Sequence, residues 1–233
     1  TFTGKDNQLH HPHQTSWGVS TRMIGGIIMT HGDNNGLVLP PRIAPIQVVI
    51  IPVAQHKEGV LEANRAVMDR LVKAGFRVKM DDSDQSAGWK FAEYEMKGIP
   101  LRLELGPKDM EKNQCVLVRR DSGEKSFVSL DGIEDTVAAM LDAIHDGLYA
   151  RAKKNLEDNT YACSSLEEVR EKMKERGGFA KTMWCGDEAC EIRMKEEAGV
   201  TSRCIPFAQE HLGDVCPICG KPAKHMIYWG VAY

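Results

Sequence analysis

Several features that would assign a protein to a class at once are missing from this sequence of 233 residues. No apolar run approaches the roughly 20 residues that a membrane-spanning helix needs. The opening segment TFTGKDNQLHH lacks the apolar core of a signal peptide. Internal repeats and low-complexity segments are missing too. The sequence therefore predicts a soluble, cytoplasmic protein with no membrane partner.

An excess of positive charge is also missing. The 33 aspartates and glutamates outnumber the 30 lysines and arginines, which gives a formal net charge of -3. Proteins that bind long nucleic acid normally carry an extended basic field, so this class is disfavoured. Any contact with nucleic acid must come from a local basic patch.

The number of cysteines is odd. There are seven, whereas a secreted disulfide framework uses an even number. Four lie in two close pairs, Cys185-x4-Cys190 and Cys216-x2-Cys219, a spacing with which two thiolates can bind one tetrahedral ion. Two such pairs predict a closed, structural zinc site in a reducing compartment, with buried or incidental free thiols as the alternative. The other cysteines are expected to be ordinary packing or surface residues: Cys115, Cys163 and Cys204.

The hydrophobic content of 42% is sufficient for a core, and the length exceeds what one domain normally needs. The segment GLVLPPRIAP (36–45) is stiffened by prolines and predicts a boundary near Pro45. From Asp158 onward, charged helix, cysteine pairs and short strands replace the earlier pattern. We therefore expect domain limits at 1–45, 46–157 and 158–233.

The middle region is predicted to be α/β. The run IQVVIIPV (46–53) is typical of a central strand buried on both faces, and Gly75 is a suitable C-terminal cap for the helix before it. Polar connections are expected at 81–88 and 106–113. Because strands and helices alternate, we expect a mixed sheet covered by helices. The expected strands are 46–53, 76–80, 99–105, 114–120 and 125–130, and the expected helices are 56–75, 89–98 and 132–156.

The last region is predicted to be a small α+β domain. Its helix, SSLEEVREKMKERGG (164–178), begins with a serine cap and carries Glu167 and Glu168 in the first turn, where the helix dipole favours them. Short strands are expected around the cysteines at 179–184, 200–207 and 224–233.

The stretch TSWGVSTR (15–22) runs directly into an apolar helix, MIGGIIMTHGD. A turn rich in glycine and hydroxyl groups that ends in an arginine usually binds an anion, and a guanidinium offers forked donors to phosphate oxygens. The alternative for Arg22 is a solvated residue on the first turn of an amphipathic helix.

Several segments together resemble the prolyl-tRNA synthetases of the archaeal and eukaryotic type, over nearly the whole chain. They are TSWGVSTR, IMTHGDNNGLVLPPRIAPIQVVIIP, GWKFAEYEMKGIPLRLELGPKDM, VLVRRDSGEK, the paired cysteines and the terminal GVAY. The resemblance implies a class II enzyme represented by its C-terminal portion. Residues 1–45 would be a motif 3 remnant of the catalytic domain with a linker, 46–157 the anticodon-binding domain, and 158–233 the zinc-binding domain.

The resemblance implies ATP-dependent ligation of L-proline to tRNA(Pro) through a prolyl-adenylate, with magnesium, by a cytoplasmic homodimer. It makes Arg22 the catalytic residue that binds the ATP phosphates and Ser20 its nucleotide-contacting neighbour. The residues that line the proline pocket would be Ser16, Trp17 and Gly18. Motifs 1 and 2 of the class are absent from these residues, so the chain alone is expected to be inactive.

Further residues matter if the resemblance holds. Single-stranded anticodon bases are recognised by stacking, by hydrogen bonds to their edges and by basic groups along the backbone. His31 and Asp33, at a helix end, would shape the catalytic site or serve only structure, and the carboxylate of Tyr233 would lie near that site. The alternative for Trp89 is a core aromatic residue, and the alternative for Arg119 and Arg120 is a solvated strand end. The anticodon candidates are Trp89, Lys90, Glu104, Arg119 and Arg120.

Two other classes of function stay open. The chain could be a stand-alone tRNA-binding or regulatory module derived from a synthetase, or a zinc-stabilised scaffold that is indifferent to anticodon sequence. An independent module would need an initiator methionine and would have no use for TSWGVSTR. Because the chain begins at Thr1, a truncated synthetase is expected.

Overall fold

The computed structural model describes residues 1–231, so the expected position of Tyr233 lies outside the described residues. The chain divides into two compact units, Thr1–Leu148 and a second that begins at Tyr149. The predicted limits at 45 and 157 stay predictions. No helix within residues 1–231 combines the length and apolar character needed to cross a membrane.

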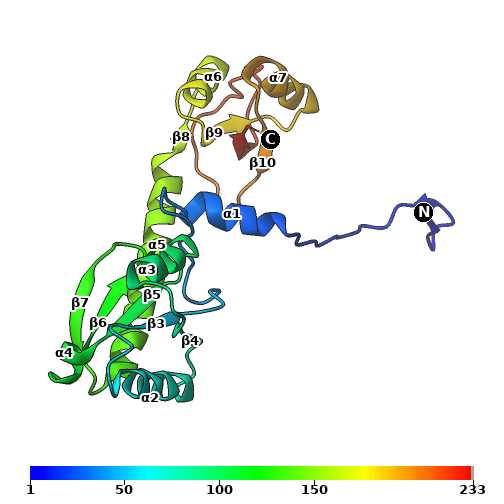
Figure 1. Cartoon of the computed structure of the whole chain (residues 1–233). Helices are drawn as coiled ribbons and strands as arrows, with labels where there is room; N and C mark the ends of the chain where they lie inside the picture. Colours follow the sequence, from blue (N-terminus) through cyan, green and yellow to red (C-terminus); the bar gives the residue numbers. More distant parts are fainter. Residues whose placement is uncertain (232–233) are drawn as a thin grey trace. The chain divides into compact units, whose positions relative to one another are not determined.

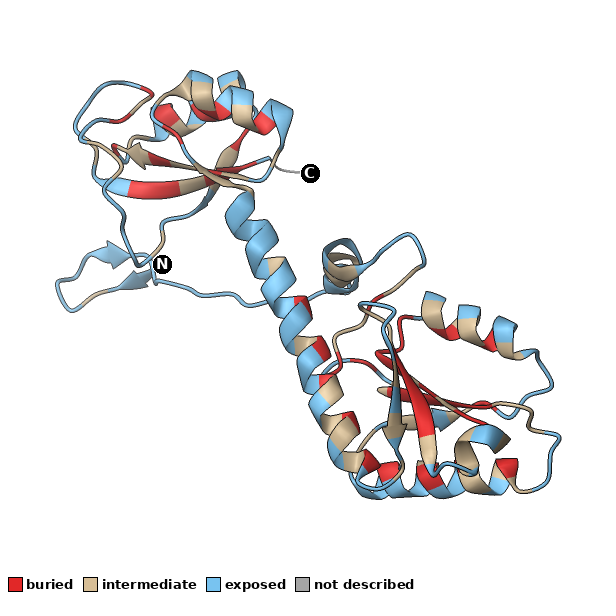
Figure 2. Cartoon of the chain, turned by 90° about the vertical axis from the view of Figure 1, so that its left-hand side faces the viewer, coloured by how far each residue is buried: buried red, intermediate tan, exposed pale blue. Residues whose placement is uncertain are grey.

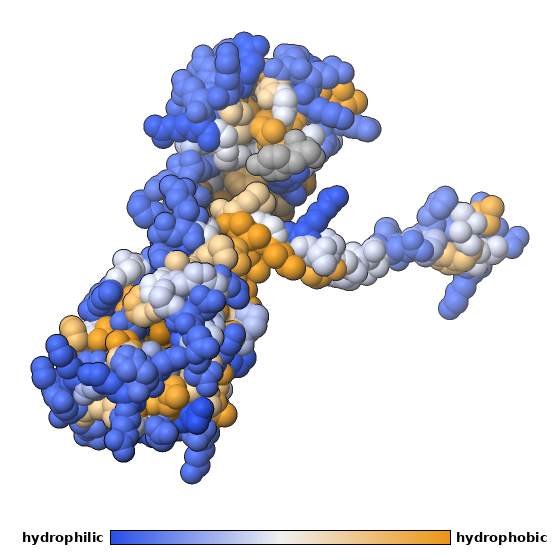
Figure 3. Space-filling view, viewed as in Figure 1, coloured by the Kyte–Doolittle hydropathy of each residue, from blue (hydrophilic) through white to orange (hydrophobic). Residues whose placement is uncertain are grey.

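The first residues form little structure of their own. A two-stranded ribbon joins β1 (Phe2–Thr3) to β2 (Leu9–His10), and residues 11–20 have no regular secondary structure. The predicted apolar helix follows as α1 (Arg22–His31), and none of its residues is buried. Apolar surface is therefore exposed over α1 (Figure 3), where Met23 and Met29 are 62% and 80% exposed.

A mixed five-stranded sheet forms the centre of the first unit (Figure 1). The strand order is β4-β3-β5-β6-β7, in which β3 runs parallel to β4 and β5, and the β5-β6 and β6-β7 pairs are antiparallel. The predicted central strand is confirmed, because every residue of β3 is buried. The strands are β3 (Val48–Pro52), β4 (Val78–Met80), β5 (Leu101–Leu105), β6 (Gln114–Arg119) and β7 (Lys125–Ser129).

Helices cover the two faces of this sheet unequally. On one face, α2 (Val60–Lys73) and the first half of α5 (Ile133–Asp158) bury an aliphatic core against alternate residues of β3, β5 and β6. On the other face, α3 (Ala87–Met96) packs against Val49 and Ile51 of β3. The expected loop at 106–113 is wrong in part, because it contains the short helix α4 (Pro107–Met110), which begins with a proline.

The second unit contains a four-stranded sheet of order β10-β11-β9-β8 with α6 (Leu166–Glu175) and α7 (Glu188–Ala198). Ser165 caps α6, as predicted, because its hydroxyl accepts the Glu168 N–H at 3.1 Å. Buried residues of α6, α7 and the strands share one core (Figure 2). The strands are β8 (Thr160–Ala162), which was not predicted, β9 (Phe179–Trp184), β10 (Thr201–Cys204) and β11 (His225–Gly230).

Candidate nucleic-acid surface and metal centre

On the face of the five-stranded sheet that carries α3, this helix reaches β5 through Phe91, and no helix of residues 1–231 covers β6 and β7. Strand residues alternate between faces, so the residues between the buried leucines of β5 point to this side. The register places Arg102 opposite Val118, and Val118 opposite Lys125. Phe127 also lies on this side and is 70% exposed. We call this surface the open sheet face, and it comprises Arg102, Glu104, Val116, Val118, Lys125 and Phe127.

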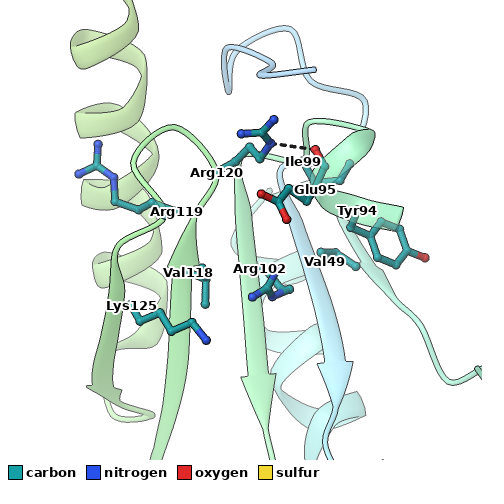
Figure 4. Close-up of a pocket in the computed structure, with 10 residues that line it drawn as sticks. Val49, Tyr94, Glu95, Ile99, Arg102, Val118, Arg119, Arg120 and Lys125 are labelled. Atoms are coloured by element: carbon teal, nitrogen blue, oxygen red, sulfur yellow. Dashed lines mark hydrogen bonds between the residues drawn. The ribbon is translucent and has the colours of Figure 1, made fainter. Parts of the chain in front are cut away.

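A hollow of about 210 Å³ opens at one end of this face, and we call it the sheet-face pocket (Figure 4). Val49 and Val118 supply apolar lining, while Glu95 approaches from the end of α3. Arg102 and Lys125 bring positive charge from β5 and β7. The pocket thus combines an apolar surface, one carboxylate and cations. Such groups can pack against a planar polar ring and form hydrogen bonds with its edge.

Two cations of the sheet-face pocket differ in how they are held. The Arg102 guanidinium lies over the Phe91 ring at 4.1 Å from its centroid and pairs with Glu104 at 2.8 Å. Stacking and pairing fix the plane of this guanidinium. Lys125 is exposed, and within residues 1–231 no acidic group lies within ion-pairing distance of it. Lys125 is therefore available to an incoming anion or acceptor.

Arg119 and Arg120 both line the sheet-face pocket, but their guanidinium groups have partners already. Arg119 donates to both carboxylate oxygens of Asp121, at 3.0 and 2.8 Å. Arg120 donates to both carboxylate oxygens of Asp33, at 2.7 Å each, and its side chain is 6% exposed. In Figure 4 the Arg119 guanidinium points away from Glu95. These arginines shape the wall of the pocket.

The other predicted anticodon residues lie elsewhere. Trp89 is 49% exposed on α3 and does not line the sheet-face pocket. Lys90 is 1% exposed, and its ammonium donates to Gln55 Oε1 at 3.1 Å and to Asp81 O at 3.0 Å. Lys90 is thus a buried structural cation, because its donors are used inside the domain. Glu104 lies on the open sheet face in its pair with Arg102.

Four groups near this site were not among the predicted residues. Glu95, Arg102 and Lys125 line the sheet-face pocket, and Phe127 lies opposite Val116 on the open sheet face. A sequence signal was present for one of them, Arg102. Arg102 and Glu104 alternate with leucines in LRLEL, which indicates a strand with one polar face. No local signal identifies Glu95, because its place beside the strands depends on how α3 packs.

The residues of TSWGVSTR are accessible but are not assembled into a site. Ser16, Trp17 and Gly18 lie in the stretch without regular structure, and Trp17 is 92% exposed. Ser20 and Arg22 are exposed at the start of α1, where the Arg22 N–H donates to Ser20 Oγ at 3.4 Å. Their assignments to ATP and proline therefore stay predictions.

The four predicted metal ligands meet in the second unit. The sulfur atoms of Cys185, Cys190, Cys216 and Cys219 all lie within 4.8 Å of one another. The Cys185 sulfur is 3.6 Å from that of Cys190 and 3.7 Å from that of Cys219. Metal–sulfur bonds of about 2.3 Å in a tetrahedron separate sulfurs by roughly 3.8 Å, so the four residues fit a zinc ion.

Local structure brings each cysteine pair into position. Cys185 follows β9, and Cys190 lies in the first turn of α7, which is capped where Asp187 Oδ1 accepts the Ala189 N–H at 3.1 Å. Cys216 and Cys219 lie in a tight turn that is closed by the Cys216 N–H, which donates to Lys221 O at 2.8 Å.

An ion pair also joins these cysteine pairs. Lys221 Nζ pairs with Asp187 Oδ2 at 3.3 Å, which connects the second turn to the cap of α7. Burial raises the pKa of the Cys190 and Cys185 thiols. Buried thiolates require a cation, and a bound metal ion would supply one. The remaining cysteines are two buried residues, Cys115 and Cys163, and an exposed one, Cys204.

Comparison with known proteins gives two family matches. A model described as an anticodon binding domain matches residues 47–140, and a model described as prolyl-tRNA synthetase, C-terminal, matches residues 166–233. The first match covers the five-stranded sheet and α3, and the second covers the four cysteines.

Whole-chain similarity extends to proteins named for one activity. The chain is 57% identical over 232 residues to proline--tRNA ligase 2 of Bacillus thuringiensis subsp. konkukian (strain 97-27). It is 58% identical over 232 residues to proline--tRNA ligase of Clostridium botulinum (strain Okra / Type B1). Each match covers 100% of this chain and 48% of the relative. The chain thus spans about half the length of the curated relatives it matches.

Proposed function

The chain belongs to the prolyl-tRNA synthetase family, whose C-terminal part it matches, and on this premise we propose that it takes part in charging tRNA(Pro). The overall reaction would be ATP-dependent ligation of L-proline to the tRNA through a prolyl-adenylate, with magnesium accompanying ATP. The complete protein would act as a homodimer in the cytoplasm. This chain would supply anticodon recognition, the motif 3 segment and a structural zinc domain.

The sheet-face pocket is the observation that carries the anticodon proposal. It lies in the unit matched by the anticodon-binding model, on a sheet face where no helix of the described residues covers β6 and β7. Bases of a single strand can be splayed out, stacked on aromatic or guanidinium planes and bound along their edges. Arg102, stacked over Phe91, and the exposed Phe127 offer such planes.

The polar groups of the sheet-face pocket favour guanine. Its edge presents two neighbouring N–H donors, which a carboxylate such as Glu95 can accept together, and it presents O6 and N7 as acceptors for a cation. Among residues 1–231, Lys125 has no ion-pair partner on this face, whereas Arg102 pairs with Glu104. A base whose edge reverses these donors and acceptors would leave buried groups without partners, which costs binding energy.

The start of the chain is proposed to serve the ATP and proline sites of the complete enzyme. Arg22 would stabilise charge on the ATP phosphates, and Ser20 would contact the nucleotide. Ser16, Trp17 and Gly18 would line the proline pocket, where glycine permits close approach of the backbone. The exposure of all five residues supports these roles, because each is accessible to a ligand.

Cys185, Cys190, Cys216 and Cys219 would hold a structural zinc ion. Four protein ligands close the coordination sphere, so the ion would supply stability and no catalytic step. The residues around it support the ligands: the Asp187 cap, the Asp187–Lys221 pair and the hydrogen bond from Arg193 Nη1 to Ile218 O at 2.7 Å.

Fluorescence anisotropy with proline tRNA, at one fixed low salt concentration, tests the anticodon proposal. We expect binding that weakens when the central anticodon bases are replaced. Lys125→Gln should weaken binding about tenfold, the scale of one lost base contact. Lys73→Gln is the matched control, since Lys73 is an exposed lysine at the end of α2. Binding that is indifferent to the anticodon bases would reject anticodon recognition and favour a scaffold.

A further inference from the structure

The segment Asp33–Leu39, which we call the strap, connects the end of α1 with the five-stranded sheet. Two backbone hydrogen bonds attach it to α3 and the turn that follows. The Leu37 N–H donates to Met96 O at 2.9 Å, and the Leu39 N–H donates to Gly98 O at 3.1 Å. The strap is thus attached directly beside Glu95, the carboxylate of the sheet-face pocket.

Two glycines allow this close contact. Gly36 and Gly98 have φ values of +129° and +71°, a region that disfavours residues with a Cβ. A Cβ on Gly36 would lie 2.5 Å from Met96 O, and one on Gly98 would lie 2.5 Å from the carbonyl carbon of Leu37. The strap and the end of α3 therefore pack backbone against backbone, which leaves little room for relative movement.

The strap holds Glu95 by its side chain. Asn35 Nδ2 donates to Glu95 Oε1 at 3.0 Å. Asn35 is itself oriented, because its backbone N–H donates to Asp33 Oδ1 at 2.9 Å. One carboxylate oxygen of Glu95 is thereby fixed.

The strap also holds Glu95 by its backbone, through Arg120. Arg120 Nε donates to Glu95 O at 2.8 Å, while its Nη1 and Nη2 donate to the two carboxylate oxygens of Asp33. Bidentate pairs of this kind have a fixed geometry. The Arg120 hydrogen bond also lowers the pKa of Asp33 to about 2, so the pair persists at physiological pH.

We infer that Asp33 and Asn35 are positioning residues for base recognition, because they hold Glu95 in place from outside the sheet-face pocket. This inference rests on the proposed function. A carboxylate that must meet two N–H groups of one base has to be held within about 0.5 Å of the productive position. Asp33 and Asn35 lie just after α1, so the strap connects the segment proposed to serve ATP with the pocket proposed to read the anticodon.

The test is a ratio of affinities measured with the full chain. Anisotropy gives the affinity for proline tRNA and for the same tRNA with single anticodon bases replaced. Asp33→Asn and Asn35→Ala should each reduce the discrimination at one base about tenfold, the scale of one charge-assisted hydrogen bond. The dependence of affinity on salt should not change, because neither residue is proposed to contact phosphate.

Asn34→Ala is the matched control. Asn34 lies between the two positioning residues and is exposed, and within residues 1–231 its side chain makes no hydrogen bond. It should leave the discrimination ratio unchanged. Asn35→Gln keeps an amide within reach of Glu95 and should restore part of the ratio. Thermal melts identify any variant that is unfolded, and Asn35→Ala, which removes one exposed hydrogen bond, is the milder change.

The outcomes separate the inference from its premise. A wild-type chain that does not discriminate between anticodons rejects the proposed function. A wild-type chain that discriminates, together with folded Asp33→Asn and Asn35→Ala variants that keep the wild-type ratio, overturns the inference and leaves the proposed function standing. An equal loss of affinity for every tRNA would also overturn it, because a positioning role must act on one base.

Discussion

Both units pack helices against a sheet, yet their cores differ in composition. In the described part of the chain, the core under the five-stranded sheet contains fifteen buried residues, of which one, Cys115, is a cysteine. The core of the second unit contains twelve, and four are cysteines. Leucine, isoleucine and valine stabilise the first unit by burial alone. Three of these cysteines, Cys185, Cys190 and Cys216, belong to the four-sulfur cluster, which suits a bound cation.

The difference has a consequence for stability. A small unit with few large aliphatic residues gains less from burial, and metal ligation can supply the missing free energy. Trp229 is fully buried there, and its ring lies edge-on to that of Trp184 at 6.5 Å. These tryptophans report on the second unit, whereas Trp17 and Trp89 of the first unit are exposed.

Removal of the proposed zinc ion should have the largest effect. A structural zinc site contributes about 10 kcal/mol or more to the folded state of small zinc domains. We expect a chelator, or Cys216→Ser, to unfold the second unit and shift tryptophan emission to the red. Amide signals of β3 and β5 in the first unit should stay unchanged.

Cys204→Ser is the matched control for this experiment, because Cys204 is exposed and does not belong to the four-sulfur cluster. It should leave the emission and the response to chelator as in the wild type. Full retention of the second unit after the metal has been removed would contradict the comparison of the two cores.

A cavity in the first unit should have the next largest effect. Leu103 is 0% exposed in the middle of β5, and Leu103→Ala removes buried apolar volume. We expect a loss of about 2–5 kcal/mol in the free energy of unfolding of the first unit, measured by urea titration with signals from β3. The second unit should be unaffected. Val72→Ala, at a position 51% exposed on α2 of the same unit, should cost less than about 0.5 kcal/mol. A loss shared equally by both units would mean that they do not fold independently.

Protonation of Asp33 should have the smallest effect. Its folded pKa of about 2 is lower than its ordinary value of 3.8, because Arg120 hydrogen-bonds to the ionised form. The stabilisation is therefore present above about pH 4 and is lost as the pH falls toward 2. Because the Asp33 side chain is 46% exposed, solvent screening should keep it below about 1 kcal/mol.

Urea titrations of the first unit between pH 6 and pH 2 would measure the contribution of ionised Asp33 to the free energy of unfolding. The stability difference between wild type and Asp33→Asn should shrink as the pH falls through this window. Asp69→Asn is the control, because Asp69 is exposed and has no ion-pair partner within residues 1–231. A difference that is constant with pH would show that the Asp33 charge does not stabilise the unit.

Local sequence patterns predicted the elements well where periodicity is strong. The β-branched run at 46–53 gave a buried central strand, and the patterns for α2, α6 and the hairpin of β6 and β7 were also confirmed. Short elements were missed. α4 and β8 contain four and three residues, too few to show a period.

The candidate sites were predictable to different degrees. Cysteine spacing identified all four members of the sulfur cluster, because two thiolates separated by two to four residues can bind the same tetrahedral ion. The sheet-face pocket was only partly predicted. Arg119 and Arg120 do line it, but their guanidinium groups are taken by Asp121 and Asp33. Asp33 is 87 positions away from Arg120, so no local pattern could reveal that pair.

The sequence by itself determined the α/β class, the mixed sheet's central strand, the sulfur cluster and the resemblance to one synthetase family. These rest on short-range patterns, which hydrophobic periodicity and ligand spacing set directly. Only the tertiary structure decided that Lys90 is buried and that Arg120 donates to Asp33 and to the backbone of Glu95. It also decided that Glu95, Arg102 and Lys125 share a pocket. The reason is physical: whether a charged side chain is available to a ligand depends on which distant groups already satisfy it, and packing alone determines those partners.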